Sequence, residues 1–239
     1  MKKIVPVLFI IFMVFAYSCG EVKSFAVDFT EYYPLDVITQ NVYAYDIYYD
    51  GKYDHKYYEY FELVEKDGAQ YLYDYSYNED YEMTSLDILG ITDEGLIMVS
   101  SMSYDDEGDI ESEYDPVNAL MYPWNFSTDS KIEYGFSYSL YIDDYEQNAT
   151  IAYKISRKLK DLISFKALGN TLDTIIVDSA LSYTITLEDG RSGSASYSSY
   201  TYFSKGLGNS YTLVRGKDWK DEYKLVELIP VDEFMQNIE

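Results

Sequence analysis

Acidic side chains alternate in the segment 105–109, where Asp105, Glu107 and Asp109 could offer hard oxygen ligands to calcium. An EF-hand loop would need glycine at its sixth position and glutamate at its twelfth. Ile110 and Pro116 stand there instead, so this is not an EF-hand. The sequence leaves two interpretations open, a weak calcium site and a hairpin tip whose acids are simply solvated.

Nucleophilic and zinc chemistry have little support. His55 is the only histidine, and it lies in the polar run 53–57, where a solvated side chain is expected rather than a general base. No serine lies in a Gly-x-Ser-x-Gly segment, and one histidine with one cysteine, Cys19, cannot complete a tetrahedral zinc site. We therefore expect no cofactor and no enzymatic activity. A hydrolase that uses a pair of the 42 acidic side chains is a weaker alternative.

Cys19 is the residue with the clearest chemical role. It follows Lys2-Lys3 and thirteen apolar residues, 4–16, a run shorter than the roughly 20 residues that a membrane-spanning helix needs. The preceding residues 15–18, Phe-Ala-Tyr-Ser, resemble a lipobox without its usual leucine. We predict a lipoprotein signal peptide over 1–18 and lipidation of Cys19. The alternative is ordinary signal cleavage, which leaves Cys19 as a free thiol.

Removal of residues 1–18 takes away two lysines and no acid, so 16 basic side chains face 42 acidic ones, a net charge of −26. Nucleic-acid binding needs clustered lysine and arginine, which this composition does not offer. Contact with an anionic bilayer is expected only through the lipid. The predicted location is the cell envelope, at the periplasmic face, the outer membrane or the cell surface.

Tyrosine is the most unusual component, with thirty residues against eleven phenylalanines and two tryptophans. Tyr71, Tyr73, Tyr75 and Tyr77 alternate along one side of an expected strand. Tyrosine serves well as a half-buried strand residue, because its ring packs across strands while its hydroxyl reaches water. A functional interpretation is that these four rings form a ligand face.

Period-2 alternation dominates the chain beyond residue 31, and turn signals such as Asp50-Gly51 and Lys66-Asp67-Gly68 separate the alternating runs. The pattern predicts a single antiparallel β meander over 32–239, with a tether over 19–31 and little helix. Residues 155–162 fit a helix or a strand, and 231–238 fit one helical turn.

Several short motifs recur in a fixed order: Tyr33-Pro34-Leu35, Tyr122-Pro123-Trp124 after Asp115-Pro116, the turn and apolar strand 169–177, and Thr201 to Gly208. In this order the chain resembles a widespread group of bacterial envelope lipoproteins, over most of residues 32–228. The resemblance implies a curved antiparallel sheet similar to the half-barrel of lipoprotein carriers such as LolA. It implies no catalytic residues.

These observations favour a membrane-anchored envelope lipoprotein that binds a protein, glycan or lipid ligand, or supports envelope structure, through a tyrosine-rich sheet face. The alternative is a periplasmic carrier that holds lipid or lipoprotein in a half-barrel cavity.

Overall fold

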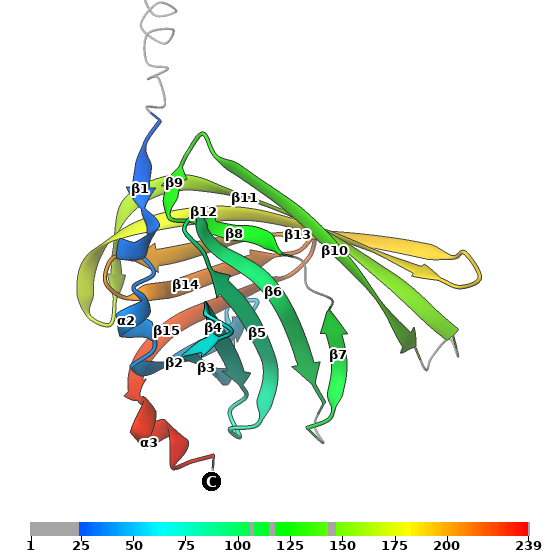
Figure 1. Cartoon of the computed structure of the whole chain (residues 1–239), viewed down its shortest axis with the longest axis horizontal. Helices are drawn as coiled ribbons and strands as arrows, with labels where there is room; N and C mark the ends of the chain where they lie inside the picture. The colour runs from blue at the N-terminus through cyan, green and yellow to red at the C-terminus, as the bar shows by residue number, and fades with distance from the viewer. Residues whose placement is uncertain (1–23, 106–107, 115–117, 143–146, 239) are drawn as a thin grey trace, which may run out of the picture.

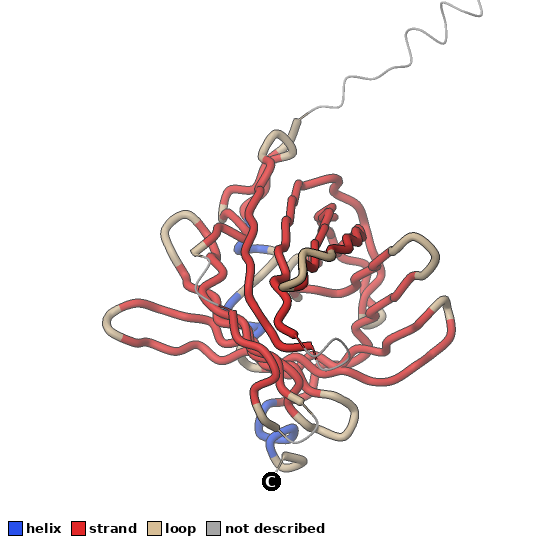
Figure 2. The backbone as a smooth tube through the Cα atoms, turned by 90° about the vertical axis from the view of Figure 1, so that its right-hand side faces the viewer, coloured by secondary structure: helices blue, strands red, loops and turns tan. Residues whose placement is uncertain are grey.

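The computed structural model describes residues 24–105, 108–114, 118–142 and 147–238. One large antiparallel sheet runs through almost the whole of this part of the chain. Its strands follow the order β10-β11-β12-β13-β14-β15-β2-β3-β4-β5-β6-β7, and β8 pairs with β6. The sheet rolls up so far that the end strand β10 contacts β7 and β8. Figure 2 shows the strands curled around a common interior. The result is a nearly closed barrel with one unsealed seam, which confirms the expected curved, mainly antiparallel fold.

The elements have the following bounds: β1 (Ala26–Asp28), η1 (Phe29–Glu31), α2 (Leu35–Ile38), β2 (Asn41–Tyr49), β3 (Lys52–Lys66), β4 (Ala69–Tyr77), β5 (Met83–Ile91), β6 (Gly95–Tyr104), β7 (Ile110–Tyr114), β8 (Ala119–Pro123), β9 (Asn125–Ser127), β10 (Lys131–Ile142), β11 (Gln147–Ala167), β12 (Asn170–Leu187), β13 (Ser192–Ser204), β14 (Gly208–Arg215), β15 (Lys220–Pro230) and α3 (Val231–Met235). The ambiguous segment 155–162 is part of β11, and the expected C-terminal turn is α3.

Turn chemistry fixes the hairpins. Asp50 and Gly51 both take positive φ, 48° and 81°, which matches the twist of the flanking strands β2 and β3. Gly208, at the start of β14, has φ 91°, and a β-carbon there would lie 3.2 Å from the Ile38 side chain. Glycine is therefore required at this entry to the barrel wall.

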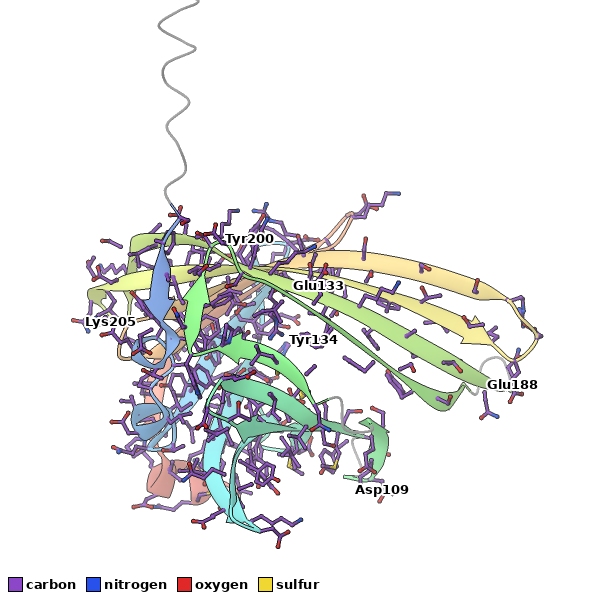
Figure 3. The ribbon with its side chains drawn as sticks, turned by 45° about the horizontal axis from the view of Figure 1, so that its top comes forward. Asp109, Glu133, Tyr134, Glu188, Tyr200 and Lys205 are labelled. Carbon is purple, nitrogen blue, oxygen red and sulfur yellow. The ribbon has the colours of Figure 1, made fainter. Side chains whose placement is uncertain are left out.

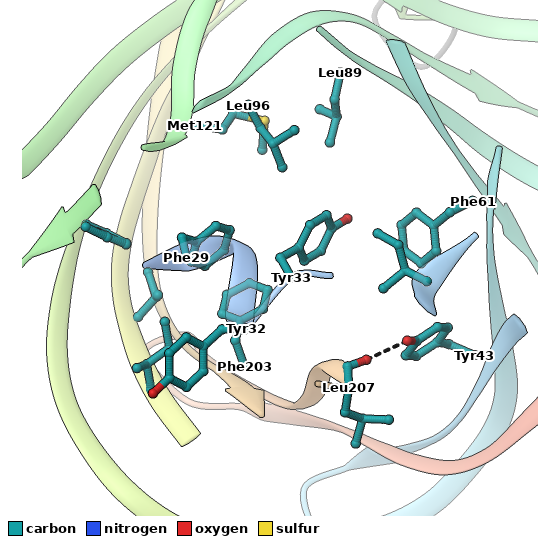
Figure 4. Close-up of a cluster of buried hydrophobic side chains, with 14 of the residues drawn as sticks. Phe29, Tyr32, Tyr33, Tyr43, Phe61, Leu89, Leu96, Met121, Phe203 and Leu207 are labelled. Carbon is teal, nitrogen blue, oxygen red and sulfur yellow. Dashed lines mark hydrogen bonds between the residues drawn. The ribbon is translucent and has the colours of Figure 1, made fainter. Parts of the chain in front are cut away.

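The N-terminal segment fills the interior of the barrel. Phe29, in η1, is completely buried, and its ring lies 4.9 Å from that of Tyr122 and 5.1 Å from that of Phe203. Tyr33 stacks against the same phenylalanine, at 5.8 Å. Figure 4 shows the rings of Phe29, Tyr33 and Phe203 at the centre of the rolled sheet. Part of the segment expected as a tether is therefore packed in the core.

The two faces of the sheet differ along β2, β3 and β4. Tyr43 and Tyr45 point into the barrel core. Outside the barrel, Phe234 of α3 packs on Tyr58 and Tyr77, at ring distances of 5.3 and 5.4 Å. The C-terminal helix thus covers one part of the outer surface and leaves the rest of β4 uncovered.

A second feature is a flat extension of the barrel wall. The ends of β10, β11, β12 and β13 run beyond the barrel as four paired strands, which we call the wing (Figure 1). Phe136, Tyr153 and Tyr183 are neighbours across it, with ring distances of 4.9 and 5.7 Å, and Ala195 pairs with Tyr183 on the same face. The opposite face carries mainly short side chains, such as Ser137, Ala152 and Ser182, together with Lys154.

Candidate functional site

The four tyrosines singled out in the sequence lie on the outer side of β4. Tyr71, Tyr73 and Tyr75 are half-buried, whereas Tyr77 is buried under α3. The Tyr75 ring stacks on that of Tyr60 at 5.6 Å and lies 6.2 Å from that of Tyr73. We call Tyr60, Tyr71, Tyr73 and Tyr75 the outer tyrosine face.

Apolar side chains extend this face across the neighbouring strands. Tyr73 pairs with Ile88 of β5, and Tyr75 pairs with Leu86, which in turn pairs with Met102 of β6. Directly opposed residues of neighbouring strands share a face of the sheet. The outer tyrosine face therefore continues over β5 and β6, where Ile88 and Met102 are half-buried and Leu86 is buried.

Glu62 supplies the charge at the border of this surface. The Tyr75 hydroxyl donates a hydrogen bond to Glu62 Oε2 at 3.2 Å. Partial burial, and next the Glu62 carboxylate, raise the pKa of Tyr75 well above its ordinary value. Tyr75 therefore stays a neutral donor at physiological pH.

The inner side of the same strands carries three acidic residues. Asp74 of β4 pairs directly with Asp87 of β5. Glu59 of β3 pairs with Ser76, which is two residues after Asp74 on the same side of β4. All three line a cavity of about 170 Å³ between the barrel wall and the N-terminal segment, with Tyr33 and Tyr45 on its other walls. We call this the acidic cavity.

Burial raises the pKa of all three carboxyl groups. It raises the pKa of Glu59 to about 7, an effect that the Tyr45 hydroxyl reduces and the charge of Asp87 increases. Burial, and then the charges of Glu59 and Asp87, hold the pKa of Asp74 well above its ordinary value. The pKa of Asp87 is also raised by burial, although a 2.5 Å hydrogen bond from Ser101 Oγ and the charge of Arg157 oppose the rise. The cavity thus holds carboxyl groups that retain protons at unusually high pH.

Arg157, on β11, is the cation that acts electrostatically on this cavity. Its guanidinium carbon lies 4.6 Å from the ring centre of Tyr122 and 5.6 Å from that of Tyr134. Within the described residues, its Nε and Nη1 atoms are buried and have no hydrogen-bond partner. Arg157 is therefore held by aromatic rings rather than by a direct ion pair.

The other sequence-predicted residues lie elsewhere. Asp105 Oδ1 accepts a hydrogen bond from the backbone N–H of Asp109 at 2.9 Å, which closes the β6–β7 hairpin. Figure 3 places Asp109 on that hairpin, away from the barrel interior. Glu107 and Cys19 lie outside the described residues. Among the side chains that the structure describes, no group of three or more His, Cys, Asp or Glu residues could hold a metal ion.

Sequence reasoning missed Glu59, Asp74 and Asp87, because alternation alone does not say which side of a strand is enclosed. One signal was present in the sequence: Asp74 is two residues from the aliphatic Leu72, so both side chains lie on the side of β4 opposite the tyrosines. In the structure Leu72 is fully buried.

A second hollow, larger than the acidic cavity, lies along the wing, with a volume of about 1200 Å³. Side chains of Tyr134, Tyr153 and Tyr197 line it together with Arg215 and many short serine, alanine and glycine residues. It is an open groove, and Figure 3 shows Tyr134 where the wing leaves the barrel and Glu188 at its far end. None of the sequence-predicted site residues lines it.

No helix in the described part of the chain has the length and apolar character needed to cross a membrane.

No protein-family model matches the sequence, and no curated protein is significantly similar to it. Solved structures with a similar fold include the following three. A predicted lipoprotein from Parabacteroides distasonis has a TM-score of 0.47 at 11% identity, over 79% of this chain and 94% of that chain. A predicted exported protein with a YmcC-like fold from Bacteroides fragilis has a TM-score of 0.42 at 9% identity, over 79% of this chain and 95% of that chain. The hypothetical lipoprotein YmcC from Escherichia coli has a TM-score of 0.35 at 9% identity, over 97% of this chain and 100% of that chain. Similarity at this level transfers no ligand or activity to this chain.

Proposed function

We propose that this chain is an exported envelope lipoprotein, anchored through a lipid on Cys19, that docks a partner protein on its outer tyrosine face. The observation that carries the proposal is the row of half-buried rings on β3 and β4, Tyr60, Tyr75 and Tyr73, next to Ile88 and Leu86 on β5.

The composition of this surface suits protein recognition. Aromatic residues and methionine are enriched at protein interfaces, with polar groups at the rim. Here Tyr73 and Tyr75 lie beside Leu86 and Met102, while Glu62 stands at the border. Tyrosine provides a large, rigid contact area with few rotatable bonds and carries a hydroxyl that bonds to either partner. Stacking between Tyr60 and Tyr75 further limits their motion, so less entropy is lost on binding.

The N-terminal sequence supports attachment to a membrane. Lys2-Lys3, the apolar run and Cys19 are the parts of a lipoprotein signal. A diacylated cysteine carries more than one acyl chain, which gives durable attachment where a single chain gives only marginal binding. A surface-bound protein with 42 acidic side chains would repel its own copies.

The acidic cavity offers little room for the alternative role of lipid carrier. Phe29 and Tyr33 occupy the centre of the barrel, and about 170 Å³ remains beside them. Drug-sized ligands occupy pockets of roughly 300–1,000 Å³. An acyl chain inside the barrel would have to displace the N-terminal segment.

The docking proposal is tested by photo-crosslinking in cells. A photoreactive amino acid replaces Tyr73, and in a matched variant it replaces Lys154, which is exposed on the wing. We expect one discrete adduct at position 73 and not at 154. The crosslinked protein, once identified and purified, should bind the Tyr73→Ala and Tyr75→Ala variants at least about ten-fold more weakly. Crosslinking that is equal at both positions, or affinity unchanged in both variants, would refute the docking proposal.

The anchor is tested separately by growth with labelled palmitate. We expect label in the wild type and none in Cys19→Ala. Label that persists in Cys19→Ala, or that is absent from the wild type, would show that Cys19 is not lipidated, whatever the outcome of the crosslinking.

A further inference from the structure

The acidic cavity is distinct from the outer tyrosine face, since it opens on the opposite side of the same strands. Glu59, Asp74 and Asp87 come from three neighbouring strands and face one space of about 170 Å³. We propose that this cavity binds a small organic cation, an ammonium compound of a few heavy atoms.

The first support is an unsatisfied acceptor. Among the described residues, Asp74 Oδ1 is shielded from solvent and has no hydrogen-bond partner. Buried polar atoms without partners are rare in folded proteins, because burial removes their hydrogen bonds to water. Asp74 lines the cavity, so an N–H donor placed there would complete its hydrogen bonding.

The second support is the excess of acid in the cavity. Asp74 and Asp87 are directly opposed across β4 and β5, where like charges repel. Arg157 acts on Asp87 from a distance, but its guanidinium lies against Tyr122 and Tyr134, and it does not line the cavity. Either protons or a cation must therefore neutralise the carboxylates. A bound cation would do so with the carboxylates ionised.

The walls suit an organic cation. Tyr33, Tyr43, Tyr45 and Tyr122 line the cavity together with Phe61. Aromatic rings attract a cation through their negative faces, and ammonium groups are recognised in this way by aromatic cages. A volume of about 170 Å³ corresponds to roughly five or six waters at about 30 Å³ each. An amine with a similar number of heavy atoms would fit.

A metal ion suits the cavity less well. Calcium needs six to eight oxygen ligands at about 2.3–2.6 Å. The described residues contain no group of three acids close enough to surround one ion, and this includes Glu59, Asp74 and Asp87. An ammonium compound can span the space between separate carboxylates, because its N–H groups point in several directions.

The test is calorimetry on the full-length chain purified in detergent. The probes are putrescine and n-butylammonium, with the neutral 1-pentanol and calcium chloride as comparisons. We expect saturable one-to-one binding of at least one amine and none of 1-pentanol or calcium. Asp74→Asn keeps the shape of the side chain and removes its charge, so it should weaken amine binding at least about ten-fold. Glu65→Gln, an acid-to-amide change at an exposed position near the end of β3, should leave the affinity within about two-fold.

The pH dependence gives a second readout that does not rely on a variant. A cation displaces protons from carboxyl groups that hold them in the empty cavity, so affinity should rise between about pH 6 and pH 8 and protons should be released on binding. The titratable groups that line this space are Glu59, Asp74, Asp87, Tyr33, Tyr43, Tyr45 and Tyr122. Tyr57 and Arg157 do not line it but interact electrostatically with its carboxyl groups.

Three results would overturn the proposal: no saturable binding of either amine, equal binding of 1-pentanol, or amine affinity that is the same in Asp74→Asn as in the wild type. Circular dichroism at each pH verifies that the variant is folded. If calcium binds and the amines do not, the ligand class is wrong.

Discussion

Adjacent residues of β4 show how the environment of polar side chains differs between the two faces of the sheet. Tyr73 and Tyr75 point outward, half-buried, with their rings in contact. Asp74, between them, points into the barrel and has a buried oxygen without a partner among the described residues. The outer face thus exposes large rings, whereas the inner face encloses a charge-bearing group.

Acids on the two faces also differ in their titration. Burial raises the pKa of Glu59, inside the barrel, to about 7. Glu222, on β15, lies outside the barrel, where hydrogen bonds from Lys220 and Lys224 lower its pKa to about 2. At neutral pH, ionisation of Glu59 inside the barrel therefore destabilises the fold, whereas ionisation of Glu222 outside it stabilises the fold. The difference teaches that the local partners of a buried acid decide its titration in this protein: Glu59 is enclosed near Asp87, whereas two lysines neutralise the charge of Glu222, whose side chain is only 14% exposed.

The largest expected effect comes from the inner core. Phe29→Ala removes a ring that is fully buried among Tyr33, Tyr122 and Phe203, and a substitution of this kind costs about 3–5 kcal/mol. Urea denaturation followed by circular dichroism measures the loss. Leu162→Ala, at a side chain that is 46% exposed, serves as the control and should cost less than about 1 kcal/mol. Equal losses in the two variants would show that the N-terminal segment does not fill the barrel.

The next effect concerns the pH dependence of stability. The pKa of Glu59 is higher in the folded protein than in the unfolded chain, so between about pH 4.5 and pH 7 the folded state binds more protons. Stability should therefore fall as pH rises through this window. Glu59→Gln removes this titrating group. The fall in the free energy of unfolding across the window should therefore be smaller in the variant by about 1–3 kcal/mol.

Urea midpoints at about pH 5 and about pH 8 measure this change, and Glu62→Gln controls for the loss of one acid from the same strand. We expect the stability of Glu62→Gln to decrease from about pH 5 to about pH 8 by as much as that of the wild type. A Glu59→Gln curve as steep as that of the wild type would mean that Glu59 titrates freely in solvent.

The sequence was sufficient to predict the strands and turns, because both are local. Asp50-Gly51 supplies the positive φ angles of its hairpin, and alternation marks strands such as 71–77. It was insufficient to predict which face is enclosed. Tyr43 and Tyr45 alternate just as Tyr73 and Tyr75 do, yet the first pair is buried in the core and the second lies outside.

The reason is that enclosure depends on contacts between distant segments. The pairing of β15 with β2 closes the wall around Tyr43 and Tyr45, and α3 covers only part of the outer surface. Phe29 had no periodic pattern around it that would mark a core residue. Asp74 resembles any solvated acid in the sequence, and only its position in the rolled sheet gives it a raised pKa.

A smaller effect is expected from the outer ion pairs. The pKa of Glu222 is lower in the folded protein than in the unfolded chain, so its contribution is complete above about pH 4.5 and is lost as pH falls toward about 2. Lys220 and Lys224 are 43% and 42% exposed, so solvent screening limits the contribution to about 1 kcal/mol. Glu222→Gln should therefore destabilise the protein at neutral pH by about that amount. A loss that persists unchanged at about pH 2 would point to packing rather than charge.

The smallest effects come from single hydroxyl groups, and they compare the two faces directly. Tyr57→Phe, inside the barrel, removes the hydroxyl that lies 2.5 Å from Oγ of the buried Ser76, which leaves that atom without this partner. We expect a loss of about 1–2 kcal/mol. Tyr75→Phe, outside, removes a 3.2 Å hydrogen bond to the solvated Glu62 and should change stability by less than about 0.5 kcal/mol. Urea denaturation of both variants at neutral pH measures the difference. If the outer variant lost as much as the inner one, the outer tyrosine face would belong to the stabilising core and would be poorly suited to docking, because its rings could not adjust to a partner.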